Sequence, residues 1–153
     1  MSPKLNRLRL EQTSKALQVF EPLKANRMPP GGWLRVIREA LGRTQRQQAG
    51  RLGIAAPTLH KSEQAEAEGR ITLAQLRKLA AGLDCELVYA LVPHRSLAEQ
   101  VEAQADRIAR LEVQGVTHSM KLEDQGPSNE FVQQQMRQRR HELLTGKWSN
   151  LWR

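Results

Sequence analysis

The sequence predicts a mainly α-helical protein with one short strand. Apolar residues recur at helical spacing over most of the 153 residues, and only one segment is rich in β-forming residues. Hydrophobic residues make up 39% of the chain, and six residues are aromatic. This composition favours a thin core shared among helices over a large sheet or barrel. We therefore expect a small helical domain between an N-terminal helical extension and C-terminal helices.

The N-terminal extension is predicted over residues 1–30. Residues 4–25 have the pattern of one amphipathic helix. Its apolar side would carry Leu5, Leu8, Ala16, Val19, Phe20 and Leu23. Two prolines and two glycines follow at residues 29–32, and they end the helix and form a connector.

The central domain is predicted over residues 31–93, as four short helices and a terminal strand. The first helix is predicted over Trp33 to Leu41 and ends at Gly42. Thr44 caps the second helix, which ends at Gly53, and Pro57 lies in the first turn of the third. Thr72 caps the fourth helix, which ends near Gly82. The strand is predicted at Glu86–Val92. Because a lone strand leaves its backbone unpaired, it needs a partner from elsewhere in the chain or from a second subunit.

The C-terminal region, residues 94–153, is predicted to be helical and to serve dimerisation or partner binding. Leu97, Val101, Ile108, Leu111 and Leu122 lie near a heptad seam that polar residues interrupt. Residues 126–128 break this helix, and Ser128 caps a last one. The strand and the broken seam are the two candidate dimer surfaces.

The second and third central helices have the features of a helix-turn-helix. Such a motif needs a small residue where two helices nearly touch and a glycine at the start of the turn. Ala49 supplies the small residue and Gly53 the turn. These positions predict a steep helix pair at the centre of the domain.

The central domain also resembles the Cro/repressor-like, or XRE, family over roughly residues 33–83. The resemblance rests on the spacing of Thr44-Gln45, Ala49, Leu52-Gly53-Ile54, Thr58-Leu59 and Glu63. It implies a lambda-repressor-like helix-turn-helix domain. Gln48 and Ser62 depart from the pattern, because the family usually has Leu or Ile there; each would cost roughly 1–3 kcal/mol if buried without a partner. We expect the extra helices to supply partners, or the helix pair to sit differently.

Further stretches resemble a family called mobile mystery protein A. These stretches are residues 32–35, 37–42, 69–73, 83–93 and 120–125. Members carry a repressor-like domain and are typically encoded beside a Fic-domain protein on mobile elements of bacterial genomes. The resemblance implies a DNA-binding, antitoxin-like partner of a Fic-domain protein.

The helix-turn-helix resemblance also assigns DNA contacts. The third helix would enter the major groove. The expected base-facing residues are Ala55, Ala56, Pro57, His60 and Lys61, and the expected phosphate-facing residues are Arg43, Gln45, Arg46 and Thr58. Lys61 can reach guanine acceptors, whereas His60 either donates to DNA or is a solvated surface histidine. Glu63, Glu66 and Glu68 are expected to form an acidic exit that repels DNA.

The charge supports a polyanionic partner. The formal net charge is +8, and residues 33–61 carry six basic side chains against one acidic one. A smaller basic patch is expected near Arg137, Arg139 and Arg140. No apolar stretch approaches the length of a membrane span, and we recognise no signal peptide, so we expect a cytoplasmic protein with no membrane role.

Catalysis finds little support in the sequence. There is no nucleophile signature and no glycine-rich phosphate loop, and His60, His94, His118 and His141 lack ligand spacing. We expect no enzyme activity, no metal and no cofactor. Two hypotheses remain. One is a dimeric, sequence-specific regulator of double-stranded DNA, as a repressor of its own operon. The other is an antitoxin-like module that holds a Fic-domain protein through its N-terminal helix or its Trp148/Trp152 tail.

Overall fold

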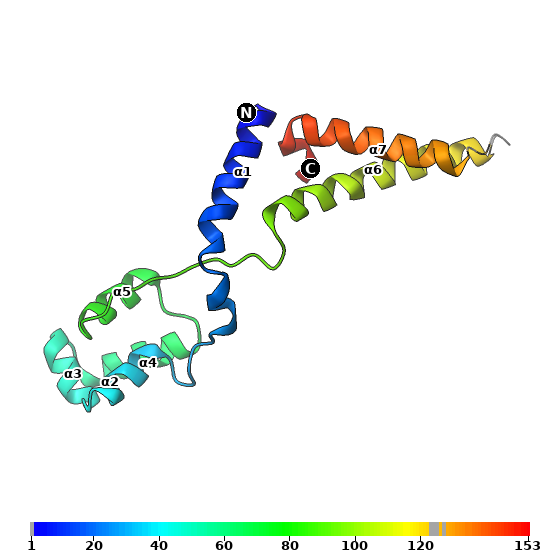
Figure 1. The fold of residues 1–153 in the computed structure, drawn as a ribbon. Helices are drawn as coiled ribbons and strands as arrows, with labels where there is room; N and C mark the ends of the chain where they lie inside the picture. Colours follow the sequence, from blue (N-terminus) through cyan, green and yellow to red (C-terminus); the bar gives the residue numbers. More distant parts are fainter. Residues whose placement is uncertain (1, 123–125, 127) are drawn as a thin grey trace. The chain divides into compact units, whose positions relative to one another are not determined.

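The computed structural model describes residues 2–122, 126 and 128–153 (Figure 1). These residues are mainly α-helical, as the sequence predicts, and they contain no strand. The elements in chain order are α1 (Pro3–Gln18), η1 (Glu21–Ala25), α2 (Trp33–Ala40), α3 (Gln45–Leu52), α4 (Ala56–Ala67), α5 (Leu73–Ala81), α6 (Leu97–Leu122), α7 (Asn129–Thr145) and η2 (Trp148–Trp152). They form two compact units: a central unit, residues 22–90, and a terminal unit, residues 1–21 with 91–153. The resembling stretch 120–125 and the predicted break at 126–128 extend into residues 123–125 and 127, which lie outside the described residues.

The N-terminal helix is shorter than predicted and does not form a separate extension. Helix α1 ends at Gln18, and a 3-10 turn, η1, follows after a two-residue turn. The cause is Pro22, which has no N–H and whose ring would clash with the carbonyl four residues earlier in a continuous helix. In the terminal unit α1 packs against α6, and Leu10 contacts the buried cluster there. The predicted boundary at residue 30 therefore differs from the observed division into units.

The core of the central unit draws on all four of its α-helices and on the turn after α5. Its buried side chains are Leu34, Ala49, Leu59, Leu79 and Leu83. Ala49 is 1% exposed and lies in α3, which packs against α4. A larger side chain there would push the two helices apart. This contact is what positions α4 relative to α3.

The local signals around α3 give the predicted structure. The Thr44 hydroxyl accepts from the Gln47 backbone N–H at 3.2 Å, and the Gln47 side chain accepts from the Thr44 N–H at 2.9 Å. Gly53 ends the helix at φ +67°, where residues with a Cβ are strained. The predicted caps Thr72 and Ser128 likewise accept from the N–H groups of Gln75 and Phe131. These contacts confirm the helix starts that the sequence predicts.

Gln48 is buried, as its unusual position in the pattern suggested, but its partners come from within the central unit. It is 1% exposed. Its carbonyl oxygen accepts from Arg43 Nη1 at 3.0 Å, and its amide donates to the Gly82 carbonyl at 2.9 Å. A Cβ at position 82 would collide with the Leu52 side chain, so glycine permits this close approach of α3 to the end of α5. Ser62 is half-buried.

The strand predicted at residues 86–92 is not formed. The segment has no regular secondary structure, and Val88, Tyr89 and Leu91 are 70%, 61% and 77% exposed. The reason is the absence of a second strand among the described residues, because β-propensity alone cannot satisfy the backbone groups of one strand.

The terminal unit is built on α6 and α7, which run side by side (Figure 1). Its buried cluster is formed by Val101, Ala105 and Leu151, with Leu10, Ile108, Leu143, Leu144 and Trp148 packed around it. Ion pairs also join the two long helices. Arg139 pairs with Glu112, which lowers the pKa of the Glu112 carboxyl through the hydrogen bond from Arg139. Arg140 reaches Asp106 at 2.6 Å. Acidic groups of α6 thus neutralise two of the three arginines expected to form a basic patch.

Candidate nucleic-acid interface

The start of α3 presents three of the residues expected to face phosphates, in different states. Arg46 is exposed and forms no ion pair within the described part of the chain. Arg43 is half-buried, and its guanidinium is partly engaged by Gln48. Gln45 is half-buried, and its amide nitrogen is turned toward α4. Of these three side chains, Arg46 is the one open to solvent.

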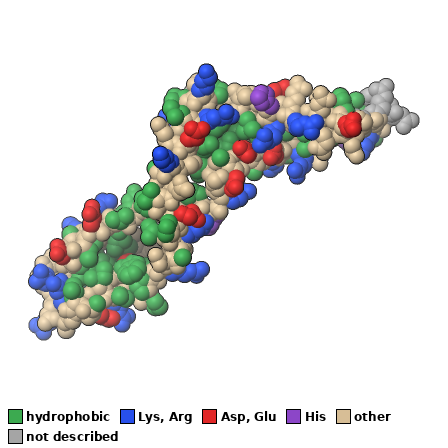
Figure 2. All heavy atoms as spheres, in the orientation of Figure 1, with side chains coloured by type: hydrophobic (Ala, Val, Ile, Leu, Met, Phe, Trp, Pro, Cys, Tyr) green, Lys and Arg blue, Asp and Glu red, His purple; other side chains and the backbone are tan. Residues whose placement is uncertain are grey.

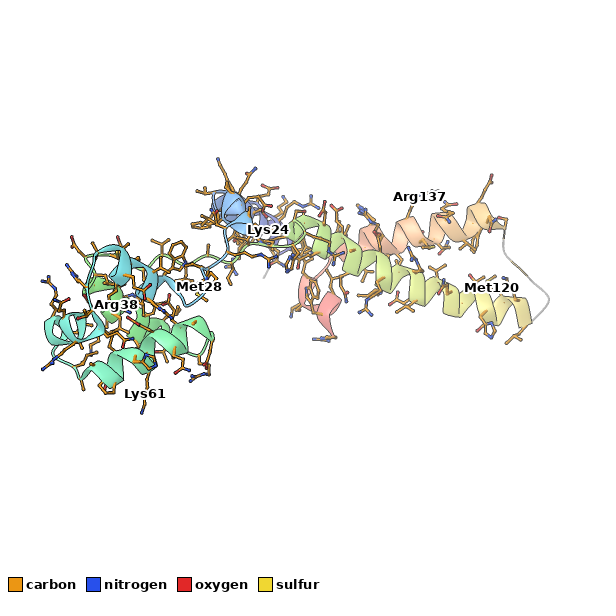
Figure 3. All side chains as sticks on the ribbon, turned by 90° about the horizontal axis from the view of Figure 1, so that it is seen from below. Lys24, Met28, Arg38, Lys61, Met120 and Arg137 are labelled. Atoms are coloured by element: carbon orange, nitrogen blue, oxygen red, sulfur yellow. The ribbon has the colours of Figure 1, made fainter. Side chains whose placement is uncertain are left out.

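The start of α4 contains the residues expected to face bases. Ala55 precedes the helix without a side-chain cap, and Pro57 is exposed in its first turn. Ala56 is half-buried and packs against the core, which corrects the expectation that its side chain is presented outward. Lys61 is exposed and points away from α4, as Figure 3 shows. The exposed residues of this helix are Pro57, Thr58, His60, Lys61 and Gln64, and Lys61 is the cation among them.

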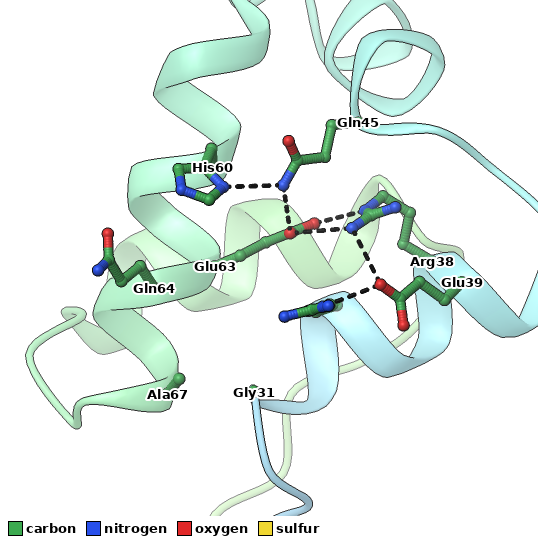
Figure 4. Close-up of a pocket in the computed structure, with 9 residues that line it drawn as sticks. Gly31, Arg38, Glu39, Gln45, His60, Glu63, Gln64 and Ala67 are labelled. Carbon is green, nitrogen blue, oxygen red and sulfur yellow. Dashed lines mark hydrogen bonds and ion pairs between the residues drawn. The ribbon is translucent and has the colours of Figure 1, made fainter.

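A polar cavity of about 480 Å³ lies between α2, α3 and α4 (Figure 4). Its floor is an ion pair between Arg38 and Glu63, which are 6% and 3% exposed. Two hydrogen bonds form this pair, from Arg38 Nε to Glu63 Oε1 at 2.6 Å and from Arg38 Nη2 to Glu63 Oε2 at 3.1 Å. Gln45 Nε2 donates to Glu63 Oε2 at 3.1 Å and lies 3.0 Å from His60 Nδ1.

Arg35 and Glu39 lie at the edge of the same cavity. Arg35 Nε donates to Glu39 Oε1 at 2.8 Å, and this hydrogen bond lowers the pKa of the Glu39 carboxyl. Both side chains are more than half exposed, so solvent screens their attraction. Because the charges of Arg35 and Glu39 are opposite, the edge of the cavity adds little net charge.

The expected acidic exit from α4 is wrong for two of its three residues. Glu63 is held by Arg38, and Glu66 is 5% exposed and accepts from the backbone N–H groups of Trp33 and Leu34. Only Glu68 is on the surface, where it pairs with Arg70. The reason is that both buried carboxylates have fixed donors on α2, which sequence spacing along α4 does not reveal. Two of the negative charges expected to repel DNA are consequently inside the unit.

A second, shallow depression of about 340 Å³ lies between α4 and α5. Thr58 lines it together with Lys61, so Thr58 is grouped with the lysine expected to face bases instead of with Gln45. Arg70 and Gln75 line it as well. The sequence analysis assigns neither residue to the interface, although a basic residue two positions before the Thr72 cap is a usable signal.

The charge of the central unit is positive. Residues 22–90 contain eleven Lys and Arg against six Asp and Glu, a formal charge of +5. The face of this unit seen in Figure 2 carries a group of apolar side chains with Lys and Arg at its margins. Because Glu63 and Glu66 are buried with only one basic residue, Arg38, the solvent-facing balance is one charge more basic than the count suggests.

No cluster of His, Cys, Asp and Glu suited to a metal ion occurs among the described residues. Within the same residues, no helix has both the length and the apolar character needed to cross a membrane. No protein-family model, curated protein or solved structure matches the chain.

Proposed function

We propose that this chain is a sequence-specific regulator of double-stranded DNA, with α3 and α4 acting as a helix-turn-helix of the Cro/repressor type. The observation that carries the proposal is the separation of charge on this helix pair. The carboxylates of Glu63 and Glu66 are buried and paired, whereas Arg46 and Lys61 are exposed. Such a surface attracts the phosphate backbone without strong local repulsion.

Each residue has a role in this proposal. Arg46 and the free N–H groups at the start of α3 hold a phosphate, since a helix N-terminus favours an anion. Helix α4 lies in the major groove, where Lys61 donates to guanine O6 or N7. Arg70, which lies beside Lys61, makes a second contact to the phosphate backbone of the DNA. The protein binds as a two-fold dimer, because one such helix covers only a few base pairs.

The test compares two single-charge variants of the full chain. Arg46→Ala should weaken binding to all duplexes alike and lower the slope of log K against log salt by about one unit. Lys61→Ala should weaken binding to the preferred site by about 1–3 kcal/mol. It should also relax the preference at one base pair when bound duplexes are selected from a random pool. Fluorescence anisotropy over a salt series measures the first effect, and sequencing of the bound pool measures the second.

The matched control is Lys147→Ala, which removes the same charge from the terminal unit. It should leave both measurements near the wild-type values. Binding of no duplex at low salt, or an equal loss in all three variants, would contradict the proposal.

A second candidate function is an antitoxin-like module that holds a Fic-domain protein. The feature that favours it is a groove of about 400 Å³ between α6 and α7. Its apolar lining is Val113, Val116, Met120, Phe131 and Val132. The Trp148/Trp152 tail supports it less, because Trp148 packs into the terminal unit and only Trp152 is largely exposed.

Co-purification with a Fic-domain protein encoded beside the gene tests this candidate. Val116→Asp should abolish the complex, whereas Leu122→Asp, at a more exposed position outside the groove lining, should not. Retention of the complex by Val116→Asp would remove the groove from consideration.

A further inference from the structure

In the cavity between α2, α3 and α4, the buried Arg38–Glu63 pair determines which of the surrounding atoms donate hydrogen bonds and which accept them. Arg38 places two N–H groups on the two oxygens of Glu63, and both side chains are nearly inaccessible to solvent. A third N–H of Arg38 donates to the Arg43 carbonyl at 2.8 Å, which holds the guanidinium in place. The carboxylate of this pair accepts hydrogen bonds only. Any side chain that approaches Glu63 Oε2 must therefore present a donor.

This condition sets the orientation of the Gln45 amide. Gln45 lies 3.1 Å from Glu63 Oε2, and its carbonyl oxygen would repel the carboxylate there. The amide nitrogen therefore faces inward, and the carbonyl oxygen points away from Glu63, as Figure 4 shows. One of the two N–H bonds goes to Glu63, and the other is directed at His60 Nδ1, 3.0 Å away. Both donors of Gln45 are thus used inside the protein.

The same condition sets the tautomer of His60. Because Gln45 supplies an N–H, His60 Nδ1 must supply the lone pair, so the neutral ring carries its hydrogen on Nε2. This second ring nitrogen points away from Gln45, and the side chain is exposed (Figure 4). The outward polar atoms are consequently an acceptor, Gln45 Oε1, and a donor, His60 Nε2–H.

We propose that Gln45 and His60 form a reading pair for a base edge, with their polarity set by the buried Arg38–Glu63 ion pair. Gln45 Oε1 accepts from the amino group of an adenine or a cytosine, and His60 Nε2–H donates to a neighbouring acceptor. This inference rests on the proposed DNA-binding function and deepens it. It also reverses the expected role of Gln45, since a phosphate needs a donor and both of its N–H groups are occupied.

The first experiment tests the hydrogen bonds without DNA. In the full-length protein, NMR measures how fast the side-chain N–H protons of Gln45 exchange with solvent. His60→Asn places an amide oxygen near the position of Nδ1 and should keep both protons protected, whereas His60→Leu removes the acceptor. Exchange of one proton should then rise on the order of tenfold, as expected for the loss of one hydrogen bond.

The exposed Gln64 amide is the reference for an unprotected group in the same spectra. Exchange of the Gln45 protons at the Gln64 rate in wild-type protein would overturn the proposal. So would equal protection in His60→Asn and His60→Leu.

The second experiment tests the reading role with a random-duplex pool. Gln45→Lys offers only donors, so it should reduce the preference at one base pair about fivefold while other duplexes bind as well or better. Unchanged preferences with higher affinity for every duplex would show that residue 45 faces a phosphate, and this would overturn the proposal. If wild-type protein binds no duplex, the reading role fails with the proposed function, and the exchange rates still report whether the hydrogen bonds exist.

Discussion

Glu66 replaces a helix cap that the sequence around α2 does not supply. Helix α2 begins after Gly32, which has no side chain to accept from the first N–H groups. Glu66 reaches across from α4 and accepts from Trp33 N at 3.1 Å and Leu34 N at 2.9 Å. A carboxylate is also favoured at this end of a helix by the helix dipole. At position 32 a Cβ would lie 2.7 Å from Glu66 Oε2, so glycine is required for the approach.

We expect Glu66→Ala to lower the free energy of unfolding by about 1–3 kcal/mol, because one buried and one part-buried N–H group lose their acceptor. The control is Glu68→Ala, two residues further along the chain. Its exposed pair with Arg70 should be worth less than about 0.5 kcal/mol. Urea unfolding followed by circular dichroism measures both, and equal losses would contradict the capping role.

The difference between local and distant contacts explains which residues of the candidate site the sequence predicts. Each of the caps Thr44, Thr72 and Ser128 accepts from the backbone N–H three residues later, so spacing alone identifies them. Glu63 and Glu66 find their partners 25 and about 32 residues away. Their sequence positions show only an acidic helix, and the packing of α2 on α4 decides that they face inward.

At the scale of elements, the terminal unit depends on its last residues. Leu151 is fully buried against Val101 and Ala105. Trp148 Nε1 donates to the Leu144 carbonyl at 2.9 Å, which fixes the start of η2 on the end of α7. The tail thus fills space beside α6 that would otherwise expose apolar side chains.

Leu151→Ala should therefore destabilise the protein by about 2–4 kcal/mol, since a fully buried leucine leaves a cavity when truncated. Trp152→Ala is the control, because Trp152 is 58% exposed and should change stability by less than about 1 kcal/mol. Thermal and urea unfolding provide the comparison. A larger loss for Trp152→Ala would show that the tail is held by its last tryptophan instead.

The elements that the sequence mispredicts share one physical cause. Strong helix periodicity and caps act locally, so α2 to α7 begin close to the residues that these signals indicate. The strand at 86–92 would have required a second strand to pair with. A continuous helix over residues 4–25 would have required a residue other than proline at position 22. Membership of α1 in the terminal unit depends on the contact of Leu10 with a cluster about 90 residues later, which no pattern within α1 reveals.

At the scale of the whole molecule, the segment between the two units is unusual for a connector. Linkers between compact units are generally polar and rich in Gly or Pro. Six of the seven residues from Glu86 to Val92 are apolar, and Val88, Tyr89 and Leu91 are largely exposed. Its backbone is available for pairing, and a second copy of the chain would supply an identical strand.

Two-fold pairing of this segment has one register that uses all seven residues. A two-fold axis normal to an antiparallel ribbon places a central residue opposite its own copy, and for residues 86–92 that residue is Tyr89. Leu87 then faces Leu91 of the second copy, and Glu86 faces Val92. No like charges meet. This dimer follows from the proposed function, which needs two recognition helices on neighbouring half-sites.

We therefore expect Tyr89→Cys, in a Cys85→Ser background, to form a disulfide-linked dimer under mild oxidation, because residue 89 meets its copy at the short distance of a directly opposed pair. Val19→Cys in the same background is the control, at a position 76% exposed and far from the segment in sequence. Non-reducing gels give the yield of each, and sedimentation of the wild-type chain shows whether a dimer forms at micromolar concentration without the cysteine. Equal yields from the two positions together with a monomeric wild-type chain would exclude pairing of this strand.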